Sequence, residues 1–303
     1  MAKVSICVPV YNNLNCVQRL MISIAKQDYT DFEVIITDDS TNREIEDYIH
    51  AVQDETDDPA LAEIGSKLRY RHNEKPLGHI FNWNKALELA KGEYIKIMFS
   101  DDWFRRPDSL GKMVRLLEDN RDADLAFCGT GQVLLKEDKE ELLRERAASE
   151  AFVRRLKTDY RNLFLGNEIG APSATIYRNG QFRFDEKSNW ASDMFLYFDI
   201  LIKNPVFAWT GEALINIGEH EDQYTNLFGE RDERKYEDYR YMYEKYRLFE
   251  SSDCREYFLK EFLLPYKKGS KAAAACRIEP RKYQRERIKY LWNAIKWKVW
   301  SRT

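Results

Sequence analysis

The chain has 303 residues, of which 44% are hydrophobic and 33% charged, with only 13 glycines and 8 prolines. This composition excludes the collagen-like, low-complexity and disordered classes and predicts a globular protein of one large or two smaller domains. The formal net charge is −3, but residues 267–303 carry twelve Lys or Arg against two Glu, and such a basic tail on an acidic body indicates an anionic partner for the tail.

The five cysteines are scattered and never form a C-x-x-C pair. This pattern argues against a disulfide framework or a zinc site and indicates a reducing compartment. The first apolar run is interrupted at Pro9, so we expect no export signal. Because no stretch approaches the roughly 18 consecutive apolar residues that span a bilayer, we expect a cytoplasmic protein whose membrane contact, if any, is peripheral.

Strands and helices are expected to alternate from the amino terminus. Apolar, β-branched runs predict buried strands, and apolar residues at helical spacing predict the helices between them. The expected strands are 4–10, 32–37, 68–71, 94–99 and 125–128, and the expected helices are 17–27, 45–53, 81–90 and 109–117. The alternation predicts a mostly parallel central sheet with helices on both faces.

The pattern changes after residue 131. The charged stretch 136–165 is expected to be a helix, and a segment punctuated by Gly and Pro follows to residue 220. Within that segment an apolar helix is expected to end at Ile202. From Tyr236 on, the sequence is Tyr-rich and is expected to be helical.

Polar clusters follow three of the expected strands, at 11–13, 38–42 and 100–102. Ligands of open α/β sheets bind at the carboxyl edge of the strands, so we expect these clusters to line one crevice. Asp101 and Asp102 repel each other, and a site that keeps both ionised supplies a cation or hydrogen-bond donors. Mg²⁺ and Mn²⁺ bind carboxylates together with substrate phosphates. The pair therefore indicates a metal-bound diphosphate, the alternative being a solvated turn or a helix N-cap.

Two further residues are candidates for chemistry. Asp193 precedes the apolar helix, where it either caps the helix or faces the crevice and accepts a proton. His220 is one of four histidines and, taken alone, predicts a surface residue.

Taken together, these residues resemble the family 2 glycosyltransferases, which have the GT-A fold. The matching segments are VSICVPVYN (4–12), DFEVIITDDS (31–40), NEKPLG (73–78), NKAL (84–87), AKGEYI (90–95), SDDW (100–103) with Pro107, IGAPSA (169–174), FDE (184–186) and ASD (191–193). They cover residues 3–225 in the family's order. The resemblance implies an inverting hexosyl- or N-acetylhexosaminyltransferase. It would move a sugar from a nucleotide diphosphate sugar, expected to be UDP-linked, to a hydroxyl of a glycan or polyprenyl-linked acceptor in bacterial surface polysaccharide synthesis.

The resemblance also assigns roles to individual residues. It implies that the nucleotide sugar is bound by Pro9, Tyr11, Asp38, Asp39, Arg71 and Asp101, that Mn²⁺ or Mg²⁺ is bound by Asp102, Asp101 and His220, and that Asp193 is the catalytic base. Two positions depart from the family pattern. Phe99 stands where many members have an acid, and Ser192 stands where a Glu often precedes the base.

The resemblance divides the chain into three parts. Residues 1–130 would form a nucleotide-sugar-binding α/β half, 131–225 the acceptor-binding half of the same GT-A domain, and 226–303 a helical extension. In the extension a helical apolar stripe is flanked by basic residues, so the segment 281–302 either lies on the anionic inner leaflet of a membrane or packs on the protein body. The stripe consists of Ile288, Leu291, Trp292, Ile295 and Val299, and the flanking residues are Arg287, Lys289, Lys296 and Lys298. No nucleic-acid motif is present, so we expect no nucleic-acid partner.

Two alternatives to the transferase are considered. A sugar nucleotidyltransferase would have a Gly-rich, basic phosphate loop near the amino terminus, but residues 8–14 contain neither Gly nor Lys. A non-catalytic nucleotide-sugar-binding module would keep the crevice without turnover. The presence of both Asp102 and Asp193 argues against such a module.

Overall fold

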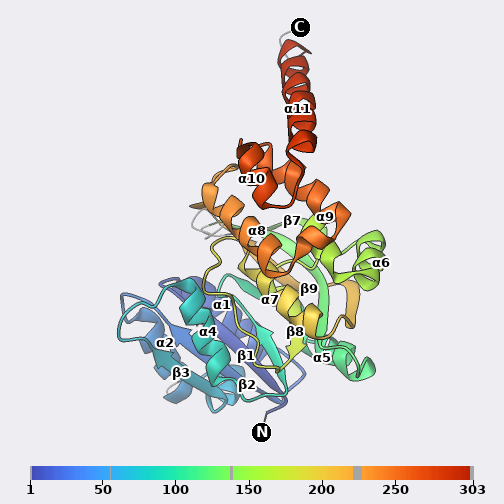
Figure 1. Cartoon of the computed structure of the whole chain (residues 1–303). Coiled ribbons are helices and arrows are strands. Elements are labelled where there is room, and N and C mark those ends of the chain that lie inside the picture. The colour runs from blue at the N-terminus through green and yellow to red at the C-terminus, as the bar shows by residue number, and fades with distance from the viewer. Residues whose placement is uncertain (1, 55, 137–138, 221–226, 301–303) are drawn as a thin grey trace. The chain divides into compact units, whose positions relative to one another are not determined.

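The computed structural model describes the chain except residues 1, 55, 137–138, 221–226 and 301–303, and except the side chains of 294–300. The chain forms two compact units (Figure 1). Unit 1 consists of Met1–Tyr160, Asn167–Glu186 and Ser192–Gln223, and unit 2 consists of Arg161–Gly166, Lys187–Ala191 and Tyr224–Thr303.

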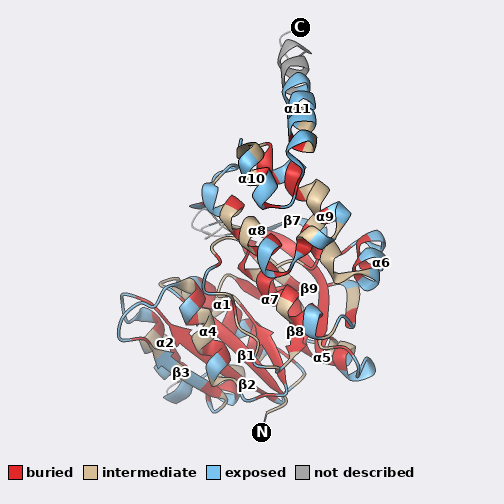
Figure 2. Ribbon diagram, in the orientation of Figure 1, coloured by how far each residue is buried: buried red, intermediate tan, exposed pale blue. Residues whose placement is uncertain are grey.

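The first half of the sheet in unit 1 is parallel. Strand β1 (Val4–Val10) pairs with β2 (Phe32–Asp38) and with β4 (Tyr94–Ile97), and β2 pairs with β3 (Leu68–His72). Every residue of β1 is buried, as expected of a parallel strand that is covered on both faces (Figure 2). The alternation predicted for this half is confirmed.

Helices connect these strands, close to where the apolar spacing predicts them. They are α1 (Leu14–Ala25), α2 (Glu44–Asp54), α3 (Pro59–Gly65), α4 (His79–Leu89) and α5 (Ser109–Asp119). Asn13 caps α1 by accepting the Cys16 N–H at 3.2 Å, so the polar pair after β1 ends the strand and starts the helix.

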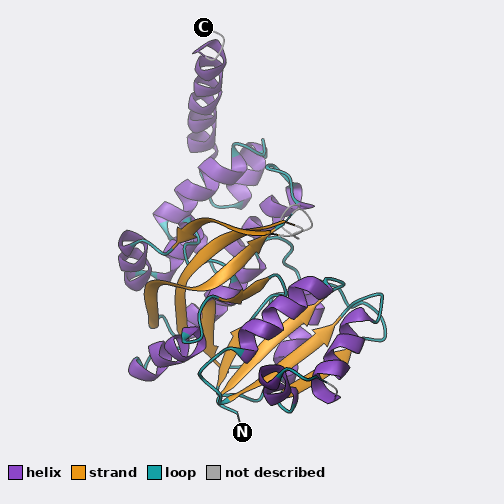
Figure 3. Cartoon of the chain, turned by 180° about the vertical axis from the view of Figure 1, so that it is seen from behind, coloured by secondary structure: helices purple, strands orange, loops and turns teal. Residues whose placement is uncertain are grey.

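The second half of the sheet is mixed (Figure 3). Strand β8 (Thr175–Arg178) runs antiparallel to β4 and to β6 (Leu125–Lys136). Strand β9 (Phe207–Glu219) is parallel to β6 and antiparallel to β5 (Asp102–Phe104). The strand order is β3-β2-β1-β4-β8-β6-β9-β5, with β7 paired to β6.

The helix predicted over 136–165 is wrong. Strand β6 continues to Lys136, and β7 (Lys139–Arg146) returns antiparallel to it. Helix α6 (Glu150–Thr158) and a 3-10 turn (Tyr160–Leu165) follow. Every described residue of β7 is exposed. A strand with no buried face lacks the alternation of apolar and polar residues that would reveal it, so its charges resemble those of a solvated helix.

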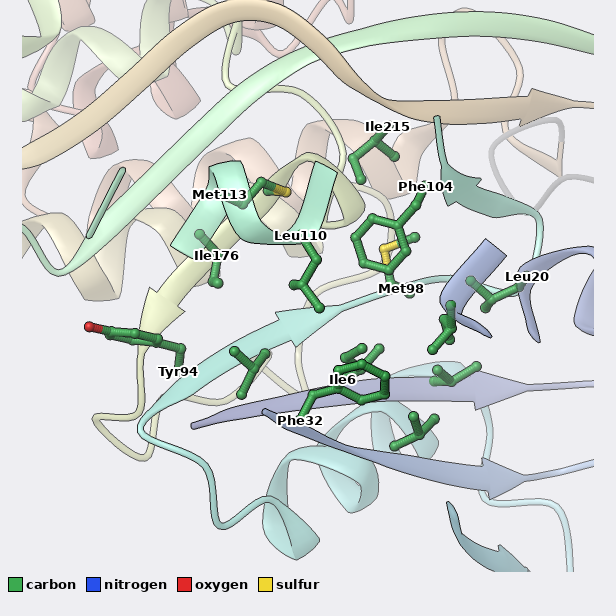
Figure 4. Close-up of a cluster of buried hydrophobic side chains, with 14 of the residues drawn as sticks. Ile6, Leu20, Phe32, Tyr94, Met98, Phe104, Leu110, Met113, Ile176 and Ile215 are labelled. Carbon is green, nitrogen blue, oxygen red and sulfur yellow. The ribbon is translucent and has the colours of Figure 1, made fainter. Parts of the chain in front are cut away.

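The core of unit 1 surrounds the junction of β4 and β5. Figure 4 shows Leu20 of α1, Met98, Phe104 of β5 and Leu110 of α5 close together, above Ile6 of β1. All of these side chains are buried. Burial of each contributes roughly 1.5–3 kcal/mol, so this packing fixes both ends of the turn that carries Asp101 and Asp102.

Unit 2 is helical, as the Tyr-rich sequence predicts. Its helices are α8 (Glu233–Lys245), α9 (Ser252–Phe258), a π-helical turn (Leu259–Leu263), α10 (Gly269–Ala275) and α11 (Pro280–Trp300). Stacked aromatic rings join these helices. The ring centroids of Tyr243 and Phe258 lie 4.5 Å apart, and those of Tyr239 and Phe262 lie 4.1 Å apart. Among the described residues we find no helix with both the length and the apolar character that a bilayer span requires.

Candidate active site

The carboxyl ends of the parallel strands meet at one edge of the sheet. The register places Val10 of β1 opposite Asp38, and Asp38 opposite His72 of β3. Strand β4 ends opposite Cys7, so the Asp101–Asp102 turn follows at the same edge. The expected common edge is therefore present.

Asp38 is completely buried. Its Oδ1 accepts the Ser40 N–H at 2.7 Å, and its Oδ2 accepts the Tyr70 hydroxyl at 2.7 Å. Burial and the neighbouring carboxylate raise the pKa of Tyr70, so this phenol stays protonated and keeps donating. Asp38 thus holds the ends of β2 and β3 together from inside the protein.

Asp39 shapes the loop that precedes α4. Its Oδ1 accepts Asn73 Nδ2 and the Leu77 N–H, each at 2.9 Å, and its Oδ2 accepts the Gly78 N–H at 2.8 Å. Gly78 has a φ of +89°, which glycine adopts readily. Beside this loop Tyr11 follows β1 and is 57% exposed, so an aromatic face is open to solvent at the sheet edge.

Two other predicted nucleotide contacts have different surroundings. Pro9 lies within β1 and is buried. Arg71 is exposed on β3. Lys85 and, to a smaller degree, Arg183 and Arg71 lower the pKa of Glu88 on α4. Their roles in nucleotide binding remain predictions.

Asp101 and Asp102 differ in exposure. Asp102 is 3% exposed, and its carboxylate accepts the Gly218 N–H at 3.3 Å and the hydrogen bond of Ser173. Burial raises the pKa of Asp102 well above its usual range, and Asp101 adds to the rise. Asp101 has a 25% exposed side chain, and its Oδ2 lies 3.3 Å from His220 Nε2.

Asp101 and His220 lie within hydrogen-bond distance of each other and are the pair of side chains that could bind one divalent cation together. Adjacent ligands of an octahedral ion with bonds of about 2.1 Å lie about 3 Å apart, close to the spacing of these two atoms. The described residues contain no group of three or more His, Cys, Asp or Glu that could hold a metal ion. A cation here would therefore need further oxygen ligands, and a diphosphate supplies them. Asp102 faces inward, and its metal role remains a prediction.

Asp193 lies in the first turn of α7 (Ser192–Lys203), and both its oxygens accept hydrogen bonds. Its Oδ1 accepts the Met194 N–H at 2.8 Å, and its Oδ2 accepts Asn167 Nδ2 at 2.7 Å. The Asn167 side-chain oxygen accepts the Ile169 N–H at 3.0 Å, which fixes the orientation of the amide. Burial and the Asp193 charge raise the pKa of Tyr197, whose hydroxyl donates to Gly170 O at 2.9 Å.

One loop contacts both acidic groups. Residues 167–174 carry Asn167, which binds Asp193, and Ser173, which binds Asp102. Six residues of extended chain span at most about 20 Å, and the 3-10 turn Pro172–Ala174 shortens that span. The two acids therefore belong to one region of unit 1. The segment 169–174 is one of those that match the family in sequence. The sequence does not, however, identify Asn167 as the partner of Asp193 or Ser173 as the partner of Asp102.

The comparisons with known proteins give the family. The model of glycosyl transferase family 2 matches residues 5–182, more than half of the chain. The chain belongs to this family.

Curated relatives of this family 2 chain are similar over parts of their length. An uncharacterized glycosyltransferase of Rickettsia typhi is 27% identical over 74% of this chain and 66% of its own length. The GalNAc(5)-diNAcBac-PP-undecaprenol beta-1,3-glucosyltransferase of Campylobacter jejuni is 28% identical over 34% of this chain and 30% of its own length. The chain spans 33% to 66% of the length of the first relatives it matches.

Solved structures confirm the predicted GT-A fold. TarS of S. aureus, solved in complex with UDP-GlcNAc, has a TM-score of 0.59 and 18% identity over 86% of this chain and 67% of TarS. Mannosyltransferase PcManGT from Pyrobaculum calidifontis, solved in complex with GDP-Man and Mn²⁺, has a TM-score of 0.50 and 15% identity. It aligns over 100% of this chain and 88% of its own.

Proposed function

We propose that this family 2 chain is an inverting glycosyltransferase that moves a sugar from a nucleotide diphosphate sugar to a hydroxyl group. The observation that carries the proposal is the 167–174 loop, which holds Asp193 through Asn167 and Asp102 through Ser173. An inverting displacement needs a base on one side of the sugar and charge stabilisation on the other. Asp193 would be the base, and the turn that Asp102 supports would carry the cation-binding side of the site.

The leaving-group side consists of Asp101, His220 and the buried Asp102. Asp101 and His220 would hold Mn²⁺ or Mg²⁺, which would neutralise the charge that develops on the departing diphosphate. Asp102 supports the turn from inside through its bonds to Gly218 and Ser173. Removal of the cation with a chelator should weaken donor binding, and Mn²⁺ should restore it.

Asp193 would be the base. The hydrogen bonds from Asn167 and Met194 orient the Asp193 carboxylate. An acceptor hydroxyl would therefore approach a carboxylate oxygen whose position is already fixed. A positioned base contributes about 10²–10⁴-fold to such a step. The proton of the hydroxyl moves to Asp193 as the oxygen attacks the anomeric carbon, and the diphosphate leaves from the opposite face.

The donor is proposed to be UDP-linked and the acceptor a glycan or a polyprenyl-linked sugar. The UDP-GlcNAc complex of TarS and the undecaprenol-linked substrate named for the Campylobacter relative support these classes. Tyr11 and Asp39 would contact the nucleoside directly, with Pro9, Asp38 and Arg71 around them. The proposed process is bacterial surface polysaccharide synthesis.

Substitution of the base tests the proposal. Asp193→Asn should lower transfer by about 10²–10⁴-fold with unchanged donor affinity. Asp199→Asn, in the same helix, is the matched control. The assay follows nucleoside diphosphate release in the presence of acceptor. Parent-like turnover by Asp193→Asn would refute the base assignment, and release of pyrophosphate would indicate a nucleotidyltransferase.

We also propose that α11 binds the anionic inner leaflet, so that the enzyme would work as a peripheral protein on the cytoplasmic face of the membrane. Ile288 is 68% and Leu291 48% exposed, so within unit 2 this part of the stripe is not covered by the other helices. Tyr283, on another side of the helix, is buried and accepts the Gly269 N–H at 3.0 Å. The remainder of the predicted stripe, at 295 and 299, and residues 301–302 lie outside the described side chains.

A further inference from the structure

Lys96 is a completely buried lysine in the middle of β4. Strand β4 pairs with β8 only through Tyr94 and Ile95, so from Lys96 onward the two strands separate. Buried carbonyl groups that lose strand partners need other donors. Lys96 Nζ provides them: it donates to Ile97 O at 3.2 Å and to Ser173 O.

Ser173 is hydrogen-bonded through both its backbone and its side chain. Its carbonyl accepts Lys96 Nζ, while its hydroxyl accepts the Phe99 N–H at 3.1 Å and bonds to the Asp102 carboxylate. Lys96 and Asp102 therefore hold the same residue, one through its backbone and the other through its side chain. Ser173 is itself completely buried, so this contact is made in the protein interior.

We propose that Lys96 is a positioning residue that anchors the 167–174 loop and thereby sets the separation between Asp193 and the Asp101–Asp102 turn. The inference rests on the proposed function. Lys96 is fully buried and donates to the Ser173 carbonyl, so it would act through Ser173. Without that anchor the loop would shift, and Asn167 at its other end would carry the Asp193 carboxylate with it.

This role predicts a specific kinetic pattern. The proposed nucleoside contacts, Tyr11 and Asp39, follow β1 and β2, whose mutual pairing does not include Lys96. The pairing of β1 with β4 at Lys96 is made by the backbone, which a side-chain substitution leaves in place. Donor affinity should therefore survive the loss of Lys96. Transfer should fall, because a misplacement of about 1 Å between reacting groups costs on the order of 10²-fold in rate.

The test compares three variants of the full chain. Lys96→Met removes the donor and leaves an unbranched apolar side chain one atom shorter, and Ser173→Ala removes the hydroxyl that joins Phe99 to Asp102. Ser5→Ala is the matched control. Ser5 is also completely buried and also binds a carboxylate and a backbone N–H, those of Glu33 and Gly92, but it lies near the amino end of β1.

The readouts are kcat, donor KM and the melting temperature. We expect Lys96→Met and Ser173→Ala each to lower kcat by about 10- to 100-fold with donor KM within twofold, and Ser5→Ala to keep the parent kcat. Combining the first two changes should cost less than the sum of their separate effects, because both act on the placement of the same residue, Ser173.

Several results would overturn the inference. These are a parent-like kcat in Lys96→Met, a fall in donor affinity equal to the fall in kcat, or a Ser173→Ala variant that behaves like Ser5→Ala. If Lys96→Met does not fold, the comparison of the two serine variants decides. Transfer by the parent chain, measured in parallel, separates this failure from that of the proposed function. A parent that releases no nucleoside diphosphate in the presence of acceptor refutes the function itself, whereas an active Asp193→Asn refutes only the base assignment.

Discussion

At Gly218 the backbone of β9 runs so close to the Asp101–Asp102 turn that no side chain fits. A Cβ at this position would lie 2.3 Å from the carbonyl oxygen of Asp101 and 2.9 Å from Leu135 Cδ1. The Gly218 N–H also donates to the Asp102 carboxylate at 3.3 Å. A glycine thus lets one strand support the two acids of another.

Gly218→Ala should push the turn away from β9. We expect the unfolding free energy to fall by about 1–3 kcal/mol, as for other insertions into packed sites, and the Mn²⁺-dependent donor affinity to fall with it, because Asp101 moves. Urea unfolding and donor titration measure the two effects. Gly229→Ala, where a Cβ would meet nothing within 4 Å, is the control. An unchanged donor affinity would contradict the expectation.

Lys96 predicts how stability depends on pH. Burial lowers the pKa of Lys96 to about 7, and the neighbouring Cys128 and Asp102 groups oppose the shift to a smaller degree. Above pH 7 the unfolded chain keeps a proton at this lysine that the folded chain releases. The unfolding free energy therefore rises with pH through this group, by about 1 kcal/mol per pH unit, up to the pKa of an ordinary lysine.

Lys96→Met should remove that contribution. Urea unfolding of the parent and of the variant at several values between pH 7 and 9 measures it, and the parent should gain stability relative to the variant as the pH rises. Titrating groups that do not interact with Lys96 are common to both proteins and cancel in the difference. Parallel pH profiles would show that the lysine does not titrate in the folded state.

Single residues also show where sequence reasoning stops. Asp101 and Asp193 stand out because acids at the ends of expected strands and helices have a chemical meaning, whereas His220 is singled out only by the resemblance to the family. Lys96 does not stand out, because a lysine in an apolar run is ordinarily an exposed residue. Its role depends on the separation of β4 from β8, which no local pattern records.

Among the elements, α11 has the clearest link between sequence pattern and proposed function. Its exposed Ile288 and Leu291 lie one turn apart, next to Arg287 and Lys289. Each basic residue near an anionic leaflet contributes about 1 kcal/mol, and an apolar stripe adds its own burial.

Replacement of both Ile288 and Leu291 by Ser should abolish flotation of the full chain with vesicles that contain anionic lipid. The matched control, Asn293→Ser, changes an exposed polar residue of the same helix and should float like the parent. Binding of the parent should weaken as salt rises, because salt screens the basic residues. Equal binding to neutral vesicles would contradict the proposed charge attraction.

The elements differ in how well the sequence predicts them. Strands β1 and β2 are uniformly apolar because both their faces are covered, and such runs are easily recognised. The hairpin of β6 and β7 is missed because β7 is held along one edge and has no buried face. Its charged residues are compatible with helix and strand alike, and only the pairing with β6 decides.

At the scale of the whole molecule, a single carboxylate in unit 2 holds the segment that leads into α7. Asp238 of α8 is 1% exposed and accepts the backbone N–H groups of Asn189, Trp190 and Ala191 at 2.6–3.0 Å. Ala191 is the last residue of this part of unit 2, and Asp193 is two positions further along the chain.

Asp238→Ala should affect both stability and catalysis. Each N–H group left unpaired in the interior costs about 1–3 kcal/mol, so the melting temperature should fall. Backbone amides of 189–195 should exchange faster with deuterium, and transfer should fall because the base is on the loosened segment. Glu237→Ala, which removes a half-exposed partner of Arg240 on the same helix, is the control. Unchanged exchange in 189–195 would contradict this account.

The sequence predicts the fold class and the family of the whole molecule, because ordered short motifs and alternating elements are local signals that add up. It does not predict the division into units. Residues 161–166 and 187–191 belong to unit 2 although they interrupt unit 1 in the sequence. The rings of Phe164 and Tyr243, for example, have centroids 6.0 Å apart although the two residues are far apart in the chain. Only the folded structure reveals such contacts.

This interleaving has a consequence for evolution and for protein engineering. A crossover near residue 224 would transplant most of unit 2 from a relative but leave behind two short segments adapted to the original helices. Chimeras built that way should lose the hydrogen bonds between the Asp238 carboxylate and the backbone of 189–191, and also the ring contacts of Phe164. Swaps that also carry 161–166 and 187–191 should be tolerated better, and substitutions in these segments should co-vary with those in α8 and α9 across relatives.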